Sequence, residues 1–180
     1  MSPRERLVDE LTKHALVLGD VTLSSGARAT YYVDAKRATL RPAGFSALAE
    51  LVAERARAWG ATAVGGLTMG ADPIASAVSL TSFLAGDAIP AFYVRKEPKG
   101  HGTNQWVEGK KGLPPGARVC VLEDVVTTGA STLKAVERCE IEGLRVGGVV
   151  ALVDREEGGR AAVEAKGVPL RSVFRRSDFE

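Results

Sequence analysis

Cysteine is scarce in this sequence. Cys120 and Cys139 are the only thiols among 180 residues, and neither belongs to a C-x-x-C pair or has a histidine close by. This pattern argues against a disulfide framework and offers no usual zinc-binding spacing. We therefore expect two reduced, structural thiols and a cytoplasmic protein.

Long apolar runs and an excess of one charge are also missing. No stretch has the length and apolar character of a transmembrane helix, and the first ten residues, Met1–Glu10, are too charged for a signal peptide. The formal net charge is +2, from 24 basic and 22 acidic residues, so we expect neither nucleic-acid nor membrane binding by the molecule as a whole. A Walker P-loop and a G-x-G-x-x-G motif are absent, which removes the main support for ATP or dinucleotide binding.

The segments that are present alternate between strand and helix patterns. An alternation of this kind predicts an α/β fold, with an open, mostly parallel sheet flanked by helices in a single domain of residues 1–180. Residues 60–175 would form the core, and a helix and hairpin within residues 1–40 a small hood. Residues 97–116 are polar and glycine-rich without an apolar period, which predicts a flexible catalytic loop. We expect core strands at 63–67, 91–95, 118–126, 146–153 and 170–174, hood strands at 21–23 and 30–34, and helices from Pro3, at 42–59, at 72–85, at 131–142 and at 160–166.

Two adjacent carboxylates, Glu123 and Asp124, end a short apolar run rich in β-branched residues, and a small hydroxyl-rich loop with Gly129 follows. In open α/β sheets, ligands bind at such a strand end, and the N–H groups of a helix start favour an anion. The loop therefore predicts a phosphate site, and the carboxylates could accept bonds from sugar hydroxyls or help hold hydrated Mg²⁺. The plain alternative is a helix capped by Ser131 or Thr132, with both acids merely solvated.

A cluster of cations follows the strand at 91–95 and leads into the long polar segment. Arg95, Lys96 and Lys99 are followed by His101, a titratable residue. Mobile cations that close over a pyrophosphate would stabilise its charge and exclude water. A solvated basic surface loop is the alternative.

These two stretches carry a family resemblance. The run Glu123-Asp124-Val125-Val126-Thr127-Thr128-Gly129-Ala130-Ser131 resembles the signature with which type I phosphoribosyltransferases bind 5-phosphoribosyl 1-pyrophosphate (PRPP). The Arg-Lys-x-x-Lys-x-His-Gly run at 95–102 resembles the orotate phosphoribosyltransferase family. The resemblance implies the type I fold, PRPP and orotate as substrates, Mg²⁺ held mainly through PRPP near the two acids without a direct protein site, and a homodimer whose loop acts in trans. The implied product is orotidine 5′-monophosphate, formed in pyrimidine biosynthesis.

The resemblance also implies roles for particular residues. Lys99, His101 and Asp124 would be catalytic. Thr127, Arg155, Tyr31 and Tyr32 would contact orotate, with Arg155 binding its carboxylate. PRPP would be bound by Arg95, Lys96, Lys99, His101, Glu123, Asp124, Val125, Val126, Thr127, Thr128, Gly129, Ala130 and Ser131.

Departures from the family pattern leave rivals open. Ser24 stands where many members have a hood lysine, for which Lys36 or Arg37 could substitute, and the lysine of the pyrophosphate loop is missing at Gly70. The enzyme alternative is a phosphoribosyltransferase for a purine base. The non-enzyme alternative is a PRPP-sensing regulator that binds nucleic acid through arginines near the carboxyl end, namely Arg171, Arg175 and Arg176.

Overall fold

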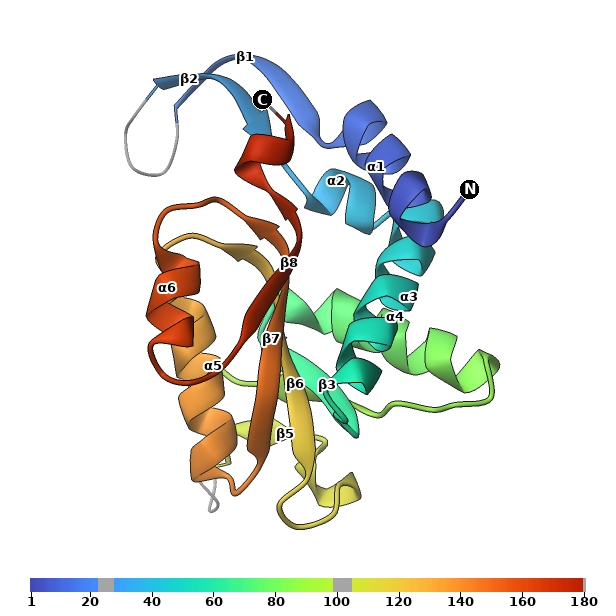
Figure 1. The fold of residues 1–180 in the computed structure, drawn as a ribbon, viewed down its shortest axis with the longest axis vertical. Helices are drawn as coiled ribbons and strands as arrows, with labels where there is room; N and C mark the ends of the chain where they lie inside the picture. The colour runs from blue at the N-terminus through green and yellow to red at the C-terminus, as the bar shows by residue number, and fades with distance from the viewer. Residues whose placement is uncertain (23–27, 99–104, 180) are drawn as a thin grey trace. The chain divides into compact units, whose positions relative to one another are not determined.

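The computed structural model describes the 180-residue chain except for residues 23–27, 99–104 and 180. The chain divides into two compact units, Met1–Leu48 and Ala49–Glu180, and the boundary lies within one helix, α3 (Pro42–Ala58). Figure 1 shows the elements in chain order. Each unit is described separately below.

The first unit begins with α1 (Pro3–His14), whose start is set by local sequence. Ser2 and Glu5 form a capping box, in which the Glu5 N–H donates to Ser2 Oγ (3.2 Å) and the Ser2 N–H donates to Glu5 Oε2 (2.7 Å). Leu7 and Leu11 are buried on one face of this helix.

An antiparallel hairpin follows α1 in the first unit. It consists of β1 (Leu16–Thr22) and β2 (Arg28–Val33), with a shift in register between Leu18 and Val21. The first hood strand thus starts five residues earlier than the expected 21–23, and Gly19 lies within it at a φ of 131°. A four-residue helix, α2 (Lys36–Thr39), was not expected, because one helical turn is too short to show a period.

The second unit contains a six-stranded sheet, and this confirms the expected open, mostly parallel α/β architecture. The strand order is β5-β4-β3-β6-β7-β8, and every neighbouring pair is parallel except β4 with β5. The elements of this unit after α3 are β3 (Ala63–Leu67), α4 (Ala71–Leu84), β4 (Ala91–Val94), β5 (Val107–Glu108), β6 (Arg118–Val126), α5 (Ala130–Ile141), β7 (Arg145–Asp154), α6 (Gly159–Glu164) and β8 (Leu170–Arg175), with 3₁₀ turns at Lys110–Gly112 and Arg176–Phe179.

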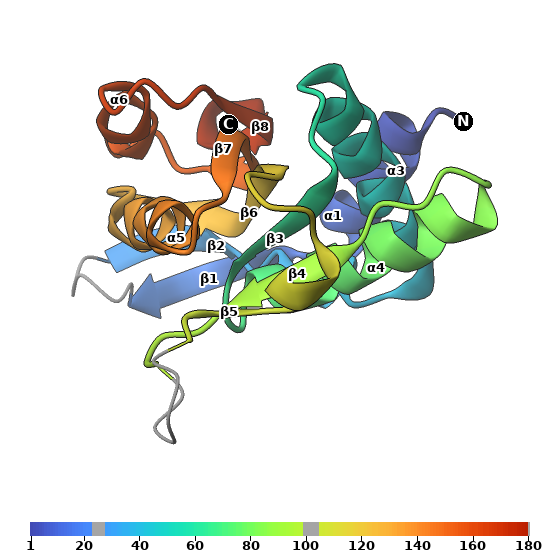
Figure 2. The same ribbon diagram turned by 90° about the horizontal axis from the view of Figure 1, so that it is seen from below.

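Helices cover both faces of this sheet, which is why its central strands β3, β6 and β7 are mostly apolar. Figure 2 shows α5 and α6 on one side and α4 on the other. Burial on both faces requires continuous apolar runs rather than alternation, and β7 is buried at eight of its ten positions. Cys120 in β6 and Cys139 in α5 are free and buried, and burial raises the pKa of each thiol to about 12.

The segment 97–116 differs in part from the expected loop. Val107 and Glu108 form β5 and pair with Val94 and Tyr93, so the sheet gains a short antiparallel edge. Helix α4 begins at Ala71, one residue before the expected start, with Gly70 in the cap position. Among the helices of the described residues, none is both long and apolar enough to cross a membrane.

Candidate active site

The carboxyl ends of the neighbouring strands β3 and β6 lie at the point where the strand order of the sheet reverses. From β3 the chain continues to β4 on one side, whereas β6 lies on the other side and leads to β7 and β8. Ligands of open α/β sheets bind at such a switch point. Gly70 follows β3 there, and a Cβ added to it would lie 2.5 Å from Oδ1 of Asp124. The turn after β3 and the acid pair of β6 therefore approach as closely as a glycine permits.

The two carboxylates differ sharply in their surroundings. Glu123 is 6% exposed, and its Oε2 accepts hydrogen bonds from Ser131 Oγ (2.8 Å) and Thr132 Oγ1 (2.9 Å). Burial is the main cause that raises the pKa of Glu123 to about 7; the neighbouring Asp124 contributes to the rise, and the two hydroxyl bonds oppose it. Asp124 is only partly buried, and its Oδ1 accepts a bond from the Val125 N–H (2.9 Å). One acid is therefore poised to hold a proton near neutral pH.

The capped-helix alternative does not describe this site. The cap position of α5 is Gly129, at a φ of 82°, and among the described residues no side chain caps this helix. Both hydroxyls that could have capped the helix, those of Ser131 and Thr132, donate to Glu123 instead. The reason is that a buried carboxylate needs donors more than a helix start does.

The loop between β6 and α5 has the form of an anion site. The first backbone bond recorded for α5 runs from the Leu133 N–H to the Gly129 oxygen (2.9 Å), and the N–H groups that precede it at a helix start point outward. A Cβ on Gly129 would lie 2.9 Å from the Gly159 oxygen. Only glycine suits both this contact and the positive φ. Of the expected PRPP residues in this loop, Thr128, Ala130 and Ser131 are exposed.

The loop after β7 is hydrogen-bonded to the end of β6 and to the loop of residues 127–131, which is called the phosphate loop after its predicted role. The Gly159 N–H donates to the Thr127 oxygen (2.8 Å), and the Arg155 N–H donates to the Val126 oxygen (2.9 Å). The Arg155 side chain is partly buried at this sheet edge, with Nη2 3.0 Å from Oε1 of Glu157. Gly159 was not singled out from the sequence, because a close approach between two loops leaves no local pattern.

The strand end at β4 is held by α5. The guanidinium of Arg95 pairs with Glu108 of β5 (3.0 Å), so this predicted pyrophosphate ligand is already engaged on its own edge of the sheet. Arg138 of α5 donates from Nη1 to the Arg95 oxygen and from Nη2 to the Lys96 oxygen (2.9 Å). The Lys96 side chain is exposed.

The other end of the predicted catalytic loop is fixed to the same helix. The guanidinium of Arg138 lies 4.1 Å from the centre of the Trp106 ring, and the main-chain N–H of Trp106 donates to Glu142 Oε1 (2.8 Å). Lys110 Nζ is 2.7 Å from Glu142 Oε2. Both flanks of the segment 99–104 are therefore anchored on α5.

Lys99, His101 and Ser24 lie outside the described residues. Tyr31 and Tyr32 lie in β2 of the first unit, where only the backbone is described. Among the described residues, no three His, Cys, Asp or Glu side chains are grouped so that they could hold a metal ion.

Comparison with known proteins identifies the family of the chain. Residues 38–169 match the phosphoribosyl transferase domain. The orotate phosphoribosyltransferase of Aquifex aeolicus (strain VF5) is 48% identical over 182 residues, which cover 99% of this chain and 98% of that protein.

The chain belongs to the orotate phosphoribosyltransferase family.

Solved structures of family members are similar to this chain in fold and sequence. The Mycobacterium tuberculosis H37Rv orotate phosphoribosyltransferase in complex with Fe(III) dicitrate has a TM-score of 0.86 and 42% identity, with 98% of each chain covered. The same protein in complex with PRPP has a TM-score of 0.81 and 39% identity, again over 98% of each chain. The resemblance and the type I fold expected from the sequence are thereby confirmed.

Proposed function

We propose that the chain uses the switch-point site to transfer the 5-phosphoribosyl group of PRPP to N1 of orotate. The reaction releases pyrophosphate and forms orotidine 5′-monophosphate, a precursor of UMP in de novo pyrimidine biosynthesis. The observation that carries this proposal is the pair of buried Glu123 and partly buried Asp124 beside a loop with the form of an anion site at the switch point, in a chain that belongs to the family. The roles given below to single residues are part of the proposal.

PRPP would span the switch point. Its 5′-phosphate would bind the N–H groups and hydroxyls of residues 127–131, and its ribose hydroxyls would donate to Glu123 and Asp124. The pyrophosphate would lie against the turn at Gly70 and the start of α4, whose N–H groups supply donors although no lysine is present there. Lys99 and His101, with Arg95 and Lys96, would add positive charge from the loop after β4.

The residues at the site fit Mg²⁺ only as a shared ion. Two carboxylates stand side by side, and the described residues offer no third ligand of the kinds that build a protein cage. Mg²⁺ commonly keeps several waters and binds through one or two carboxylates and substrate oxygens. When bound, it would neutralise charge on the pyrophosphate and the ribose oxygens.

The protein's part in the chemistry is alignment and charge stabilisation. The family's transition state resembles an oxocarbenium ion, with departure of pyrophosphate and attack of N1 on the opposite face. Holding the two anionic substrates, PRPP and orotate, in line would account for much of the rate enhancement. One fixed hydrogen-bond donor in comparable sites lowers the activation barrier by about 3–4 kcal/mol. Lys99 and His101 would stabilise the departing pyrophosphate, and Asp124 would hold the ribose.

Orotate would be read by its carboxylate. Arg155 lies one residue beyond β7, and its planar guanidinium binds a carboxylate through two parallel bonds. In this structure it pairs with Glu157 (3.0 Å), so orotate would compete with or join a carboxylate already present. Thr127 would contact the base from the phosphate loop, and Tyr31 and Tyr32 would contribute from the hood.

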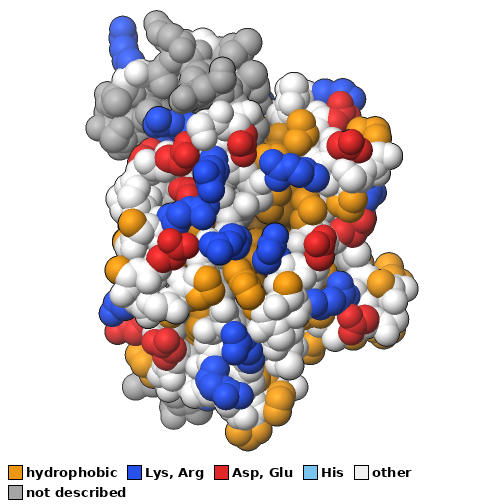
Figure 3. All heavy atoms as spheres, viewed as in Figure 1, with side chains coloured by type: hydrophobic (Ala, Val, Ile, Leu, Met, Phe, Trp, Pro, Cys, Tyr) orange, Lys and Arg blue, Asp and Glu red, His pale blue; other side chains and the backbone are white. Residues whose placement is uncertain are grey.

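A homodimer is also part of the proposal. Three large apolar side chains on α4 are exposed at i, i+3 and i+4 spacing, namely Leu80 (60%), Phe83 (69%) and Leu84 (75%). Apolar side chains are visible at the free end of α4, at the right of Figure 3. A contiguous exposed apolar surface of this kind supports association with another chain. Phe83→Asp should therefore weaken the dimer in native mass spectrometry.

Sharing of the loop in trans has a separate test. Lys99→Ala and Asp124→Ala should each be inactive and folded, and mixing them should restore part of the activity, because a heterodimer contains one complete site. Native mass spectrometry must show that subunits exchange. Exchange without any recovery would contradict action in trans. A cytoplasmic location is proposed with the dimer, supported by the two free thiols.

The first experiment follows orotate absorbance in the presence of PRPP, with Mg²⁺ added or withheld. Mg²⁺-dependent loss of orotate with stoichiometric release of pyrophosphate is the expected result. Consumption of adenine, guanine or xanthine in place of orotate would favour the purine alternative. Folded protein that consumes none of these bases would contradict the proposal and favour a sensor.

A further inference from the structure

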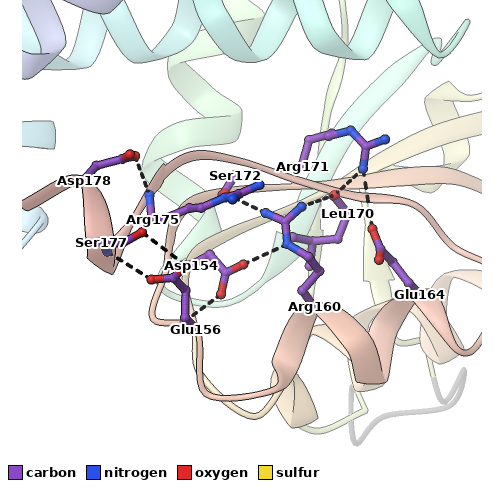
Figure 4. Close-up of polar contacts among 10 residues, drawn as sticks. All are labelled: Asp154, Glu156, Arg160, Glu164, Leu170, Arg171, Ser172, Arg175, Ser177 and Asp178. Atoms are coloured by element: carbon purple, nitrogen blue, oxygen red, sulfur yellow. Dashed lines mark hydrogen bonds and ion pairs between the residues drawn. The ribbon is translucent and has the colours of Figure 1, made fainter.

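Three acids lie at the end of β7 and in the loop that leads to α6, namely Asp154, Glu156 and Glu157, and each has a partner in the structure (Figure 4 for the first two). Asp154 ends β7 and is 2% exposed, with Oδ2 3.0 Å from Nε of Arg160. Arg160 also donates from Nη2 to Ser172 Oγ of β8 (2.9 Å). This network ties the start of the loop to α6 and β8.

Glu156 is the unusual residue of this loop. Its φ is 58°, and within the described residues it is the only residue other than glycine with a positive φ. A side chain in this region is unfavourable and persists where the surroundings fix it. The main-chain N–H of Glu156 donates to a side-chain oxygen of the preceding acid, Asp154 Oδ1 (2.9 Å).

The Glu156 side chain is bound at both of its oxygens. Oε2 accepts from the Ser177 N–H (3.0 Å), and Oε1 accepts from Ser177 Oγ (3.2 Å). Ser177 lies in the 3₁₀ turn Arg176–Phe179, which follows β8. Figure 4 shows Glu156 extending from the loop toward this turn. Two bonds to one carboxylate fix its direction as well as its position.

We propose that Glu156 is a positioning residue for base recognition: its bond pair with Ser177 holds the left-handed turn that directs the Arg155 guanidinium toward the carboxylate of the incoming base. This inference rests on the proposed role of Arg155 in binding that carboxylate. The unfavourable φ sets the chain direction between Arg155 and Glu157, whose side chains then meet at 3.0 Å. Release of Ser177 would let the loop relax to a more favourable backbone, and the guanidinium would lose its fixed orientation.

A positioning role and a purely structural role of Glu156 predict different effects on the Michaelis constants. A loss of general stability lowers the thermal midpoint and the active fraction but leaves both Michaelis constants unchanged. A loss of Arg155 orientation raises the KM for orotate, while the KM for PRPP changes far less, because the main-chain bonds from Arg155 and Gly159 to the phosphate loop are made without the Glu156 side chain.

The test compares three substitutions in the full-length enzyme, with both KM values and kcat measured. Glu156→Ala should raise the KM for orotate about tenfold, the effect of losing roughly 1.4 kcal/mol of hydrogen bonding to a charged group. Glu156→Gly relieves the unfavourable φ but also loses the bonds, so it should be as impaired as Glu156→Ala. Glu156→Gln keeps an acceptor for the Ser177 N–H and a donor for Ser177 Oγ, and it should remain close to the parent enzyme.

Two further variants separate the possible failures. Glu164→Ala removes an exposed acid of α6 that pairs with Arg171, and it serves as the matched control with unchanged constants. Arg155→Ala tests the role on which the inference rests. If Arg155→Ala leaves the KM for orotate unchanged, both the role of Arg155 and this inference are overturned.

If Arg155→Ala raises that KM but Glu156→Ala does not, only the positioning role is overturned. Equal rises in both Michaelis constants for Glu156→Ala, or a Glu156→Gly enzyme that behaves like the parent, would overturn it as well. Circular dichroism of each variant establishes that the measured protein is folded.

Discussion

Replacement of Glu123 by glutamine should change how the stability of the protein depends on pH. Burial, with a smaller contribution from Asp124, raises the pKa of Glu123 from 4.5 to about 7. The folded protein therefore keeps a proton that the unfolded chain releases. Its stabilising effect is fully present below about pH 4.5 and is lost as the pH rises through 7.

The size of the effect follows from the two pKa values. One pKa unit corresponds to about 1.4 kcal/mol, so between pH 5 and pH 8 the free energy of unfolding of the parent protein should lose about 2–3 kcal/mol through this group. Glu123→Gln has no proton to lose, and its amide oxygen still accepts from Ser131 and Thr132. The substituted protein should thus gain roughly 5–10 °C in thermal midpoint relative to the parent between these two pH values.

Urea unfolding followed by circular dichroism at pH 5, 6, 7 and 8, without Mg²⁺ or PRPP, measures this difference. Glu137→Gln makes the same chemical change on the exposed side of α5 and is the matched control. Asp124→Asn should move the inflection of the parent curve to lower pH, because it removes the neighbouring negative charge. Parallel pH profiles for the parent and Glu123→Gln would refute the assigned pKa and its origin in burial.

Three other outcomes are expected. Gly129→Ala places a Cβ 2.9 Å from the Gly159 oxygen at a φ of 82°, so it should cost about 1–3 kcal/mol in urea unfolding and raise the KM for PRPP; a neutral result would contradict the tight turn. Gly70→Ala should displace Asp124 and weaken PRPP binding in calorimetry, and unchanged affinity would speak against the close approach. The two buried thiols, with their pKa raised to about 12, should react with a thiol reagent only after urea is added, which absorbance of the released chromophore will show.

Local sequence was sufficient to predict the long core strands and the position of the loop between β6 and α5. The run from Val119 to Leu122 is apolar and rich in β-branched residues, and the acids that follow it and Gly129 can be read without reference to any distant residue. Strand β5 could not be predicted in the same way. It has only two residues, and its pairing with Tyr93 and Val94 depends on contacts across a polar segment.

Side-chain partners were harder to predict than elements. Ser131 and Thr132 have the composition of helix caps, and only the burial of Glu123 explains why they donate to it. Arg138 and Glu142 have the spacing of solvated charges on a helix, yet the fold brings Trp106 to both of them. The contacts of Trp106 join segments more than thirty residues apart, and no local pattern predicts them.

The main-chain bonds between the two loops at the sheet edge have a consequence for how such enzymes diversify. The Gly159 N–H and the Arg155 N–H hold the phosphate loop through the oxygens of Thr127 and Val126. Since a backbone bond does not depend on the side chain beside it, residues 155–157 can change their identity while residues 127–131 keep their support, whereas Gly158 has a φ of 91° and favours glycine. If Arg155 and residues 127–131 have their proposed roles, recognition of the base can thus change without recognition of the phosphoribosyl group. A segment grafted between Asp154 and Gly159 is the natural place to begin engineering a new acceptor.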